Sequence, residues 1–306
     1  MNFFYESISL ETLAVGLAIL IVLMGINEIA RRYKTLAIIL FIALPVFLTF
    51  FVWPNTAVPG SSVGSWFDWA KVYSSLAGAL GFMVIRYMKN AANNKYLLLF
   101  PALILAINIM EAVIRDFEVY SIHGFTDGMM LNGGSWNIMN GIAGFLNILA
   151  ISGWMGIFVS KGKSKDMIWP DQIWLWVIAY DLWNFAYTYN CVPDHSWYAG
   201  FILILASLIP FVLIKKGAWI QHRAFTLAFW MMFVMSFPSF VDTSEYAVKS
   251  SGNESALFLV SFIALLANVI LVGYHFYRIM KYKINPFKEE VYVKTKAYQE
   301  VISENK

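Results

Sequence analysis

Charged residues are scarce in this chain, and cysteine is almost absent. Asp, Glu, Lys and Arg make up 13% of the 306 residues, whereas hydrophobic residues make up 59%. Soluble domains carry about 25% charged residues, because their surface faces water. The single cysteine, Cys191, excludes an internal disulfide framework. This composition argues against a soluble globular protein and predicts an integral membrane protein.

The chain also lacks the short motifs of several enzyme classes. We find no HExxH, P-loop, GxGxxG or paired aspartate-rich motif. The four histidines are scattered, so they predict no metal site, and the last apolar run has no lysine that could hold a retinal. The net charge of +3 indicates no nucleic-acid partner. We therefore expect no cofactor, no metal and no nucleic acid.

Long apolar runs fill most of the chain instead. A transmembrane helix needs about 20 predominantly apolar residues. The runs do not alternate as β-barrel strands do, and helices pair their backbone polar groups internally. The predicted fold class is all-α, a polytopic helical bundle in a single domain over 1–285, with a short polar cytoplasmic tail over 286–306. The nine expected spans are about 11–30, 35–53, 68–88, 96–115, 136–159, 168–189, 197–214, 219–241 and 256–280.

Basic residues lie in alternate connections between these runs. Clusters that include Arg31, Lys89, Lys163, Lys216 and Lys281 all fall on one side, and the other connections are neutral or acidic. The positive-inside rule then predicts an external N-terminus and a cytoplasmic C-terminus. The first run has an acidic flank, so we expect it to be a span and not a cleaved signal peptide. We expect the protein to lie in the bacterial cytoplasmic (inner) membrane, with lipids as partners. A homo-oligomer is also possible from the sequence.

One carboxylate lies where lipid would be expected. Asp181 is inside the Trp- and Tyr-rich run 168–190, and Asn184 follows one helical turn later. An acidic side chain near the centre of a membrane helix costs about 2.5–3.5 kcal/mol on insertion scales, so it usually faces a cavity or a partner. No basic residue lies within a turn of it. Its partner is therefore expected to come from another helix, a bound cation or a proton.

Polar residues on the neighbouring runs share helical faces in the extracytoplasmic half. Residues three, four and seven apart lie on one face of a helix. We therefore predict a polar, aromatic-lined cavity between spans three to six that opens outward. Its predicted ligand-binding residues are Asp181, Asn184, Tyr187, Trp183, Glu111, Asn108, Arg115, Asn137, Asn140, Asn147, Asp68 and Lys71.

Structural roles are open for several of these residues. The spacing of Asp68 and Lys71, and that of Glu111 and Arg115, suits a local ion pair on one helix. The asparagines of the fifth run could instead join packed helices by hydrogen bonds. His195 lies in a connection beside the predicted cavity and is a further candidate.

The stretch Tyr180–Cys191, YDLWNFAYTYNC, resembles bacterial polytopic membrane proteins classed as a domain of unknown function. This resemblance implies no activity and no site residues.

We expect a transporter or channel for a small solute, ion or proton. Asp181 would bind a cation or proton, and Glu111 and Arg115 would form a gate. The alternative is an integral-membrane enzyme that uses Glu111 and Asp181 as an acid/base pair on a lipid-like or isoprenoid substrate. A ligand-sensing receptor is a third hypothesis.

Overall fold

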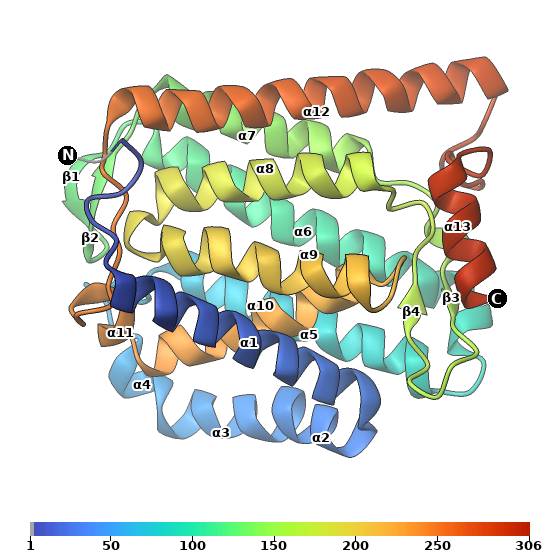
Figure 1. Ribbon diagram of the computed structural model, residues 1–306, viewed down its shortest axis with the longest axis horizontal. Helices are drawn as coiled ribbons and strands as arrows, with labels where there is room; N and C mark the ends of the chain where they lie inside the picture. The colour runs from blue at the N-terminus through green and yellow to red at the C-terminus, as the bar shows by residue number, and fades with distance from the viewer. Residues whose placement is uncertain (1–2) are drawn as a thin grey trace.

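Helices dominate the structure, a computed structural model that describes residues 3–306. They run side by side, and their ends gather at two opposite ends of the molecule (Figure 1). The helical elements are α1 (Leu10–Arg32), α2 (Lys34–Ile38), η1 (Ile39–Ala43), α3 (Leu44–Phe51), α4 (Trp53–Thr56), α5 (Trp66–Tyr87), η2 (Ala91–Asn93), α6 (Lys95–Val119), α7 (Ser135–Leu149), η3 (Trp154–Gly156), α8 (Trp174–Cys191), η4 (Pro193–His195), η5 (Ser196–Ile202), α9 (Leu203–Leu213), α10 (Trp219–Ser236), α11 (Ser239–Asp242), α12 (Glu254–Tyr282) and α13 (Lys296–Asn305). Two antiparallel hairpins join β1 (His123–Thr126) to β2 (Met129–Asn132) and β3 (Phe158–Val159) to β4 (Met167–Ile168).

Five helical segments are long and apolar enough to cross a membrane. Their outer faces expose large apolar side chains, including Ile21 of α1 (62% exposed), Phe50 of α3 (71%) and Ile270 of α12 (53%). Contiguous apolar surface of this kind is rare on soluble monomers. The fold is therefore that expected of a helical membrane protein. The five segments are Leu10–Arg32, Lys34–Phe51, Lys95–Val119, Pro193–Leu213 and Glu254–Tyr282.

The other four expected spans correspond to α5, α7, α8 and α10, which are shorter or more polar. Of the 18 residues of α10, 16 are buried, so this helix has no face left for lipid. A helix that is buried all round lies inside a bundle. In Figure 1, α10 accordingly lies behind α1, and it packs against α5 and α9. The polar residues of the inner helices therefore face other helices.

The fifth expected span, 136–159, is longer than the helix that forms there. Helix α7 ends at Leu149, and the chain then turns through η3 into the β3–β4 hairpin. Gly153 has a φ of +68°, and a Cβ at this position would lie 2.4 Å from the Asp171 Cβ. Ser152 Oγ also donates to Asp171 Oδ2 at 2.6 Å. A left-handed glycine and a buried polar contact thus end the helix within an apolar run.

The tail is folded, although the sequence predicted only a short polar extension. Val291 and Tyr292 are fully buried, and α13 packs beside β3 at the end of the bundle (Figure 1). The backbone N–H groups of Val291 and Tyr292 donate to Asp171 at 3.0 and 2.9 Å. These contacts attach the tail to the connection that precedes α8.

Candidate functional site

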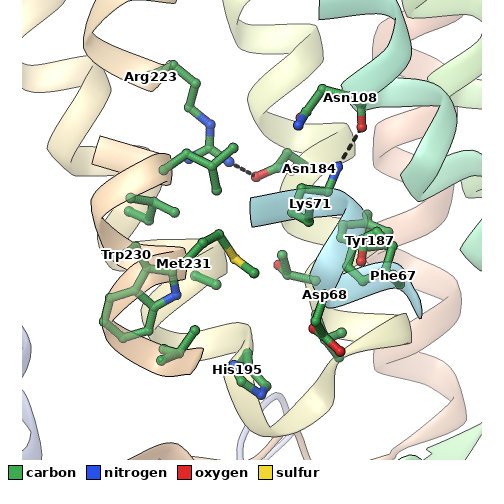
Figure 2. A pocket seen from close by; sticks show the side chains of 16 residues that line it. Phe67, Asp68, Lys71, Asn108, Asn184, Tyr187, His195, Arg223, Trp230 and Met231 are labelled. Atoms are coloured by element: carbon green, nitrogen blue, oxygen red, sulfur yellow. Dashed lines mark hydrogen bonds between the residues drawn. The ribbon is translucent and has the colours of Figure 1, made fainter. Parts of the chain in front are cut away.

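A narrow cavity lies between α5, α8, η5 and α10 (Figure 2). Its free volume is about 50 Å³, several times the roughly 10–15 Å³ that one water requires. A second cavity of about 30 Å³ shares Asn108, Arg223 and Leu227 with it and reaches Phe82 on α5. The space suits a small solute or an ion with a few waters.

Arg223 lines both cavities from the second turn of α10. It is 3% exposed, and its Nη2 donates to Asn184 Oδ1 on α8 at 2.7 Å (Figure 2). The guanidinium carbon lies 5.9 Å from the centre of the Tyr180 ring, a cation–π distance. Nε and Nη1 have no hydrogen-bond partner within residues 3–306. A buried cation with unused donors therefore forms part of the cavity wall.

Lys71 of α5 is held by α6. Its Nζ lies 3.1 Å from Glu111 Oε2 and donates to the Asn108 backbone carbonyl at 2.6 Å. Ser74 Oγ donates to Glu111 Oε2 at 3.0 Å and accepts from Asn108 Nδ2 at 3.0 Å. Lys71 and Glu111 thus form an interhelical ion pair with hydrogen bonds around it, and the charge of Lys71 is already matched.

The two local ion pairs that the spacing allowed do not form among the described residues. Asp68 Oδ2 accepts from the backbone N–H and the hydroxyl of Ser65, at 3.1 and 2.6 Å, because it lies in the first turn of α5. Arg115 turns toward the end of the bundle that carries the β1–β2 hairpin, where it contacts Glu118 at 3.1 Å and Asp127 at 2.7 Å. Asp127 is in the β1–β2 turn, so this contact attaches the hairpin to α6.

Asp181 is buried, at 7% exposed, but it is not among the residues lining either cavity. Neither carboxyl oxygen has a hydrogen-bond partner within the described part of the chain. Arg223 is the charge whose field acts on it, although the two side chains form no direct ion pair. No described basic residue forms an ion pair with Asp181, so its partner from another helix, a bound cation or a proton stays a prediction, and Arg223 lines the cavity instead of Asp181.

The asparagines of α7 serve two different contacts. Asn140 Nδ2 donates to Asp116 Oδ2 at 2.8 Å, and Asn137 Nδ2 lies 3.4 Å from Asp116 Oδ1. Asn147 Nδ2 donates to Asn268 Oδ1 on α12 at 2.9 Å. These bonds join α7 to α6 and to α12, which is the structural role that the sequence left open.

Of the twelve predicted ligand-binding residues, five line the main cavity. The five are Asp68, Lys71, Asn108, Asn184 and Tyr187. The other seven, which contact helices or the outer hairpin instead, are Asp181, Trp183, Glu111, Arg115, Asn137, Asn140 and Asn147.

Sequence reasoning missed two buried charges. Arg223 lay within the eighth expected span, 219–241, but was counted with the basic residues that flank the preceding connection, and Asp116 was assigned to an outer loop. Both are buried inside helices, since Arg223 lies in the second turn of α10 and α6 continues past Asp116 to Val119. Arg223 is the last of three consecutive polar residues at the start of α10. Three consecutive residues cannot all lie on one exposed face of a helix, so the sequence did indicate that at least one of them is buried.

A serine and a histidine meet at the outer end of the cavity. Ser62 Oγ and His195 Nε2 are 3.0 Å apart, and His195 lines the cavity, as Figure 2 shows. Residues 60–64, GSSVG, match the spacing G-x-S-x-G with Ser62 at its centre, a motif that the reasoning from sequence overlooked. This segment connects α4 to α5 without the strand that precedes a hydrolase nucleophile.

Comparison with known proteins gives a family and no activity. A family of unknown function, DUF5692, matches residues 6–304. The chain belongs to this family. No curated protein and no solved structure matches the chain. The inferences that follow therefore depend on the geometry of the site.

Proposed function

We propose that the protein is a transporter or channel for a small solute or ion, with its site in the cavity that Arg223 and Lys71 line. The observation that carries this proposal is the burial of these two cations, 3% and 6% exposed, beside free volume inside the bundle. Ionisable side chains within membrane helices are expensive, and they commonly mark ion and solute pathways.

The proposed topology has nine spans, an external N-terminus and a cytoplasmic C-terminus. Contacts between basic connections support it, because they gather at one end of the bundle. Arg31 Nη1 lies 2.8 Å from Asp166, Arg86 Nε donates to the Lys165 carbonyl at 3.0 Å, and Lys216 lies 2.7 Å from Glu304 of α13. By the positive-inside rule this end is cytoplasmic. The cavity then lies toward the outside, near the first turn of α5 and the last turn of α8.

Reconstitution into liposomes tests the proposal. Solute-induced currents and pH-sensitive dyes would report movement of small ions and polar solutes across the membrane. Ala199→Trp places a large side chain in the cavity wall, and we expect it to abolish the flux. Gly273→Trp is the matched control, because a Cβ at Gly273 of α12 meets nothing within 4 Å. Equal flux through both variants would contradict the proposal.

A membrane enzyme is the second candidate. The sequence suggested Glu111 and Asp181 as the acid/base pair of such an enzyme. Neither residue lines the cavity, so the cavity does not support this pair. The Ser62–His195 contact is the observation that favours an enzyme, since a histidine beside a serine hydroxyl can act as its base. A fluorophosphonate probe tests it. Labelling of the wild type that Ser62→Ala removes would support an enzyme, and no labelling would leave transport as the proposal.

A further inference from the structure

Arg223 has fewer hydrogen-bond acceptors than the other buried arginines of residues 3–306. Arg86 and Arg278 also form no ion pair, but Arg86 donates to three backbone carbonyls and Arg278 to the Val291 carbonyl. Arg31 contacts Glu28 and Asp166, and Arg115 contacts Glu118 and Asp127. Among the ion pairs of residues 3–306, Arg223 has none, and its one side-chain acceptor is the neutral amide of Asn184. Removing a guanidinium from water is costly unless its donors are matched. The site therefore has an unmatched positive charge.

The nearby carboxylates do not supply the missing contact. Glu111 already forms an ion pair with Lys71 and accepts a hydrogen bond from Ser74. Asp68, at the other end of the cavity, already accepts a hydrogen bond from Ser65. Asp181 lies on the same helix as Asn184 but makes no ion pair with Arg223. The acceptor that suits the free N–H groups of Arg223 must therefore come from outside the chain.

The remaining unpartnered atoms of the cavity wall are mostly donors. The Trp230 indole N–H and the Tyr187 hydroxyl both line the cavity, and neither has a hydrogen-bond partner among the described residues. Together with Arg223 they present three side chains that can donate, from α8 and α10. A ligand that accepts hydrogen bonds and carries negative charge fits this wall better than a cation does.

We infer that the cavity binds a small oxyanion of one negative charge, such as formate, acetate or nitrate, against the Nε and Nη1 groups of Arg223. The planar guanidinium suits oxygen acceptors in a plane. The free volume of about 50 Å³ limits the ligand to a few non-hydrogen atoms. The oxyanion would be the substrate of the proposed transport site. Its movement across the membrane rests on the proposed function, whereas its binding to Arg223 does not.

The test is calorimetric titration of the purified full chain in detergent with sodium formate, acetate, nitrate and chloride. We expect saturable binding of the oxyanions, weakened at least about tenfold in Arg223→Gln and less in Arg223→Lys, which keeps the charge. Arg278→Gln is the control, because Arg278 is equally buried on α12 and donates to the Val291 carbonyl outside the cavity. Thermal unfolding of each variant checks that it is folded.

Several results would overturn the inference. They are unchanged oxyanion binding in folded Arg223→Gln, chloride binding as tight as that of the oxyanions, and binding that follows the sodium concentration alone. Liposome flux separates the two proposals. Arg223-dependent oxyanion binding without flux would contradict transport and support the anion site. Flux of cations that is insensitive to Arg223→Gln would support transport and contradict the anion site.

Discussion

Buried charges have different partners at the end of the bundle that carries Asp166 and in the centre of the bundle. At the end, Asp166 accepts from Arg31, Ser164 and Gln221 at 2.8, 2.6 and 3.0 Å. In the centre, Arg223 and Asp181 leave two nitrogens and two oxygens without partners within residues 3–306. At the end of the bundle, both Asp166 oxygens and all three side-chain nitrogens of Arg31 have partners. Paired charges of this kind join the connections to one another. The two unpaired groups in the centre differ from each other as well, because Arg223 lines the cavity and Asp181 does not.

The pKa values of the carboxyl groups at the Asp166 end of the bundle follow from their partners. Burial raises the pKa of the Asp166 carboxyl, but hydrogen bonds from Ser164 and Gln221 and the charge of Arg31 outweigh burial and bring the pKa below its usual value. For Asp171, burial dominates and raises the pKa to about 6, although Ser152 and two backbone N–H groups oppose it. The acid with a cationic partner is therefore charged, and the one without responds to pH.

The largest effect should come from breaking the matched cluster. Asp166→Ala leaves Arg31 without one of its carboxylates and Gln221 without its acceptor, and it should cost about 3–5 kcal/mol of unfolding free energy. Thermal and denaturant unfolding in detergent would measure it. Glu304→Ala is the control, since its pair with Lys216 is half-exposed and worth no more than about 1 kcal/mol. Equal losses in the two variants would remove the distinction between the regions.

The contribution of Asp171 to stability should fall as the pH rises. The folded state raises the pKa of Asp171 from 3.8 to about 6, so it binds the proton more tightly than the unfolded chain does. This contribution to the unfolding free energy is then largest below about pH 4 and falls by at most about 3 kcal/mol as the pH rises through 6. Thermal and denaturant unfolding in detergent as a function of pH would measure it. Asp171→Asn should remove this part of the pH dependence, and an unchanged dependence would assign it to another group.

A smaller effect should distinguish interhelical from local pairing. A double-mutant cycle of Lys71→Met and Glu111→Gln should give a coupling energy of about 0.5–3 kcal/mol, because the two side chains are in contact. The cycle of Lys71→Met with Asp68→Asn should give less than about 0.5 kcal/mol. Unfolding free energies measure both. The reverse order would favour the local pair over the contact between α5 and α6.

The smallest effect is expected at Asp181. Its oxygens accept no hydrogen bond from the described residues, so Asp181→Asn breaks no hydrogen bond of these residues and keeps the shape of the side chain. The unfolding free energy should change by no more than about 0.5 kcal/mol. A loss comparable to that of Asp166→Ala would mean that a bound ion or water requires this carboxylate. The two carboxylates would then belong to one class.

Helix positions were largely predictable, because hydropathy alone locates apolar runs. The exceptions have local causes. Residues 150–159 are apolar, but Gly153 and the contact of Ser152 with Asp171 end α7 early. Asp116 was assigned to a connection because charge usually marks a helix end, but α6 continues past it. Arg223 lay inside the eighth expected span and was counted only with the basic residues that flank the connection before it, although it is buried in α10.

The sequence predicted the location of the cavity and its members only in part. It placed the cavity between spans three to six, whereas η5 and α10 also line it and α7 does not. Helical spacing correctly placed Lys71, Asn108 and Asn184 on faces that meet at the cavity. The same reasoning placed Asp181 there, yet its side chain is not part of the wall. Spacing on one helix describes a face but does not determine which neighbour that face meets.

The sequence by itself determined that the chain is helical, apolar and basic on alternate connections, because these properties depend on composition and on periods along one helix. Tertiary structure decided that Lys71 pairs with Glu111 and that Asp116 accepts hydrogen bonds from asparagines of α7. It also decided that two nitrogens of Arg223 have no acceptor among the described residues. The reason is physical. Partners on different helices meet through the packing of all the helices together, and no single run of residues records that arrangement.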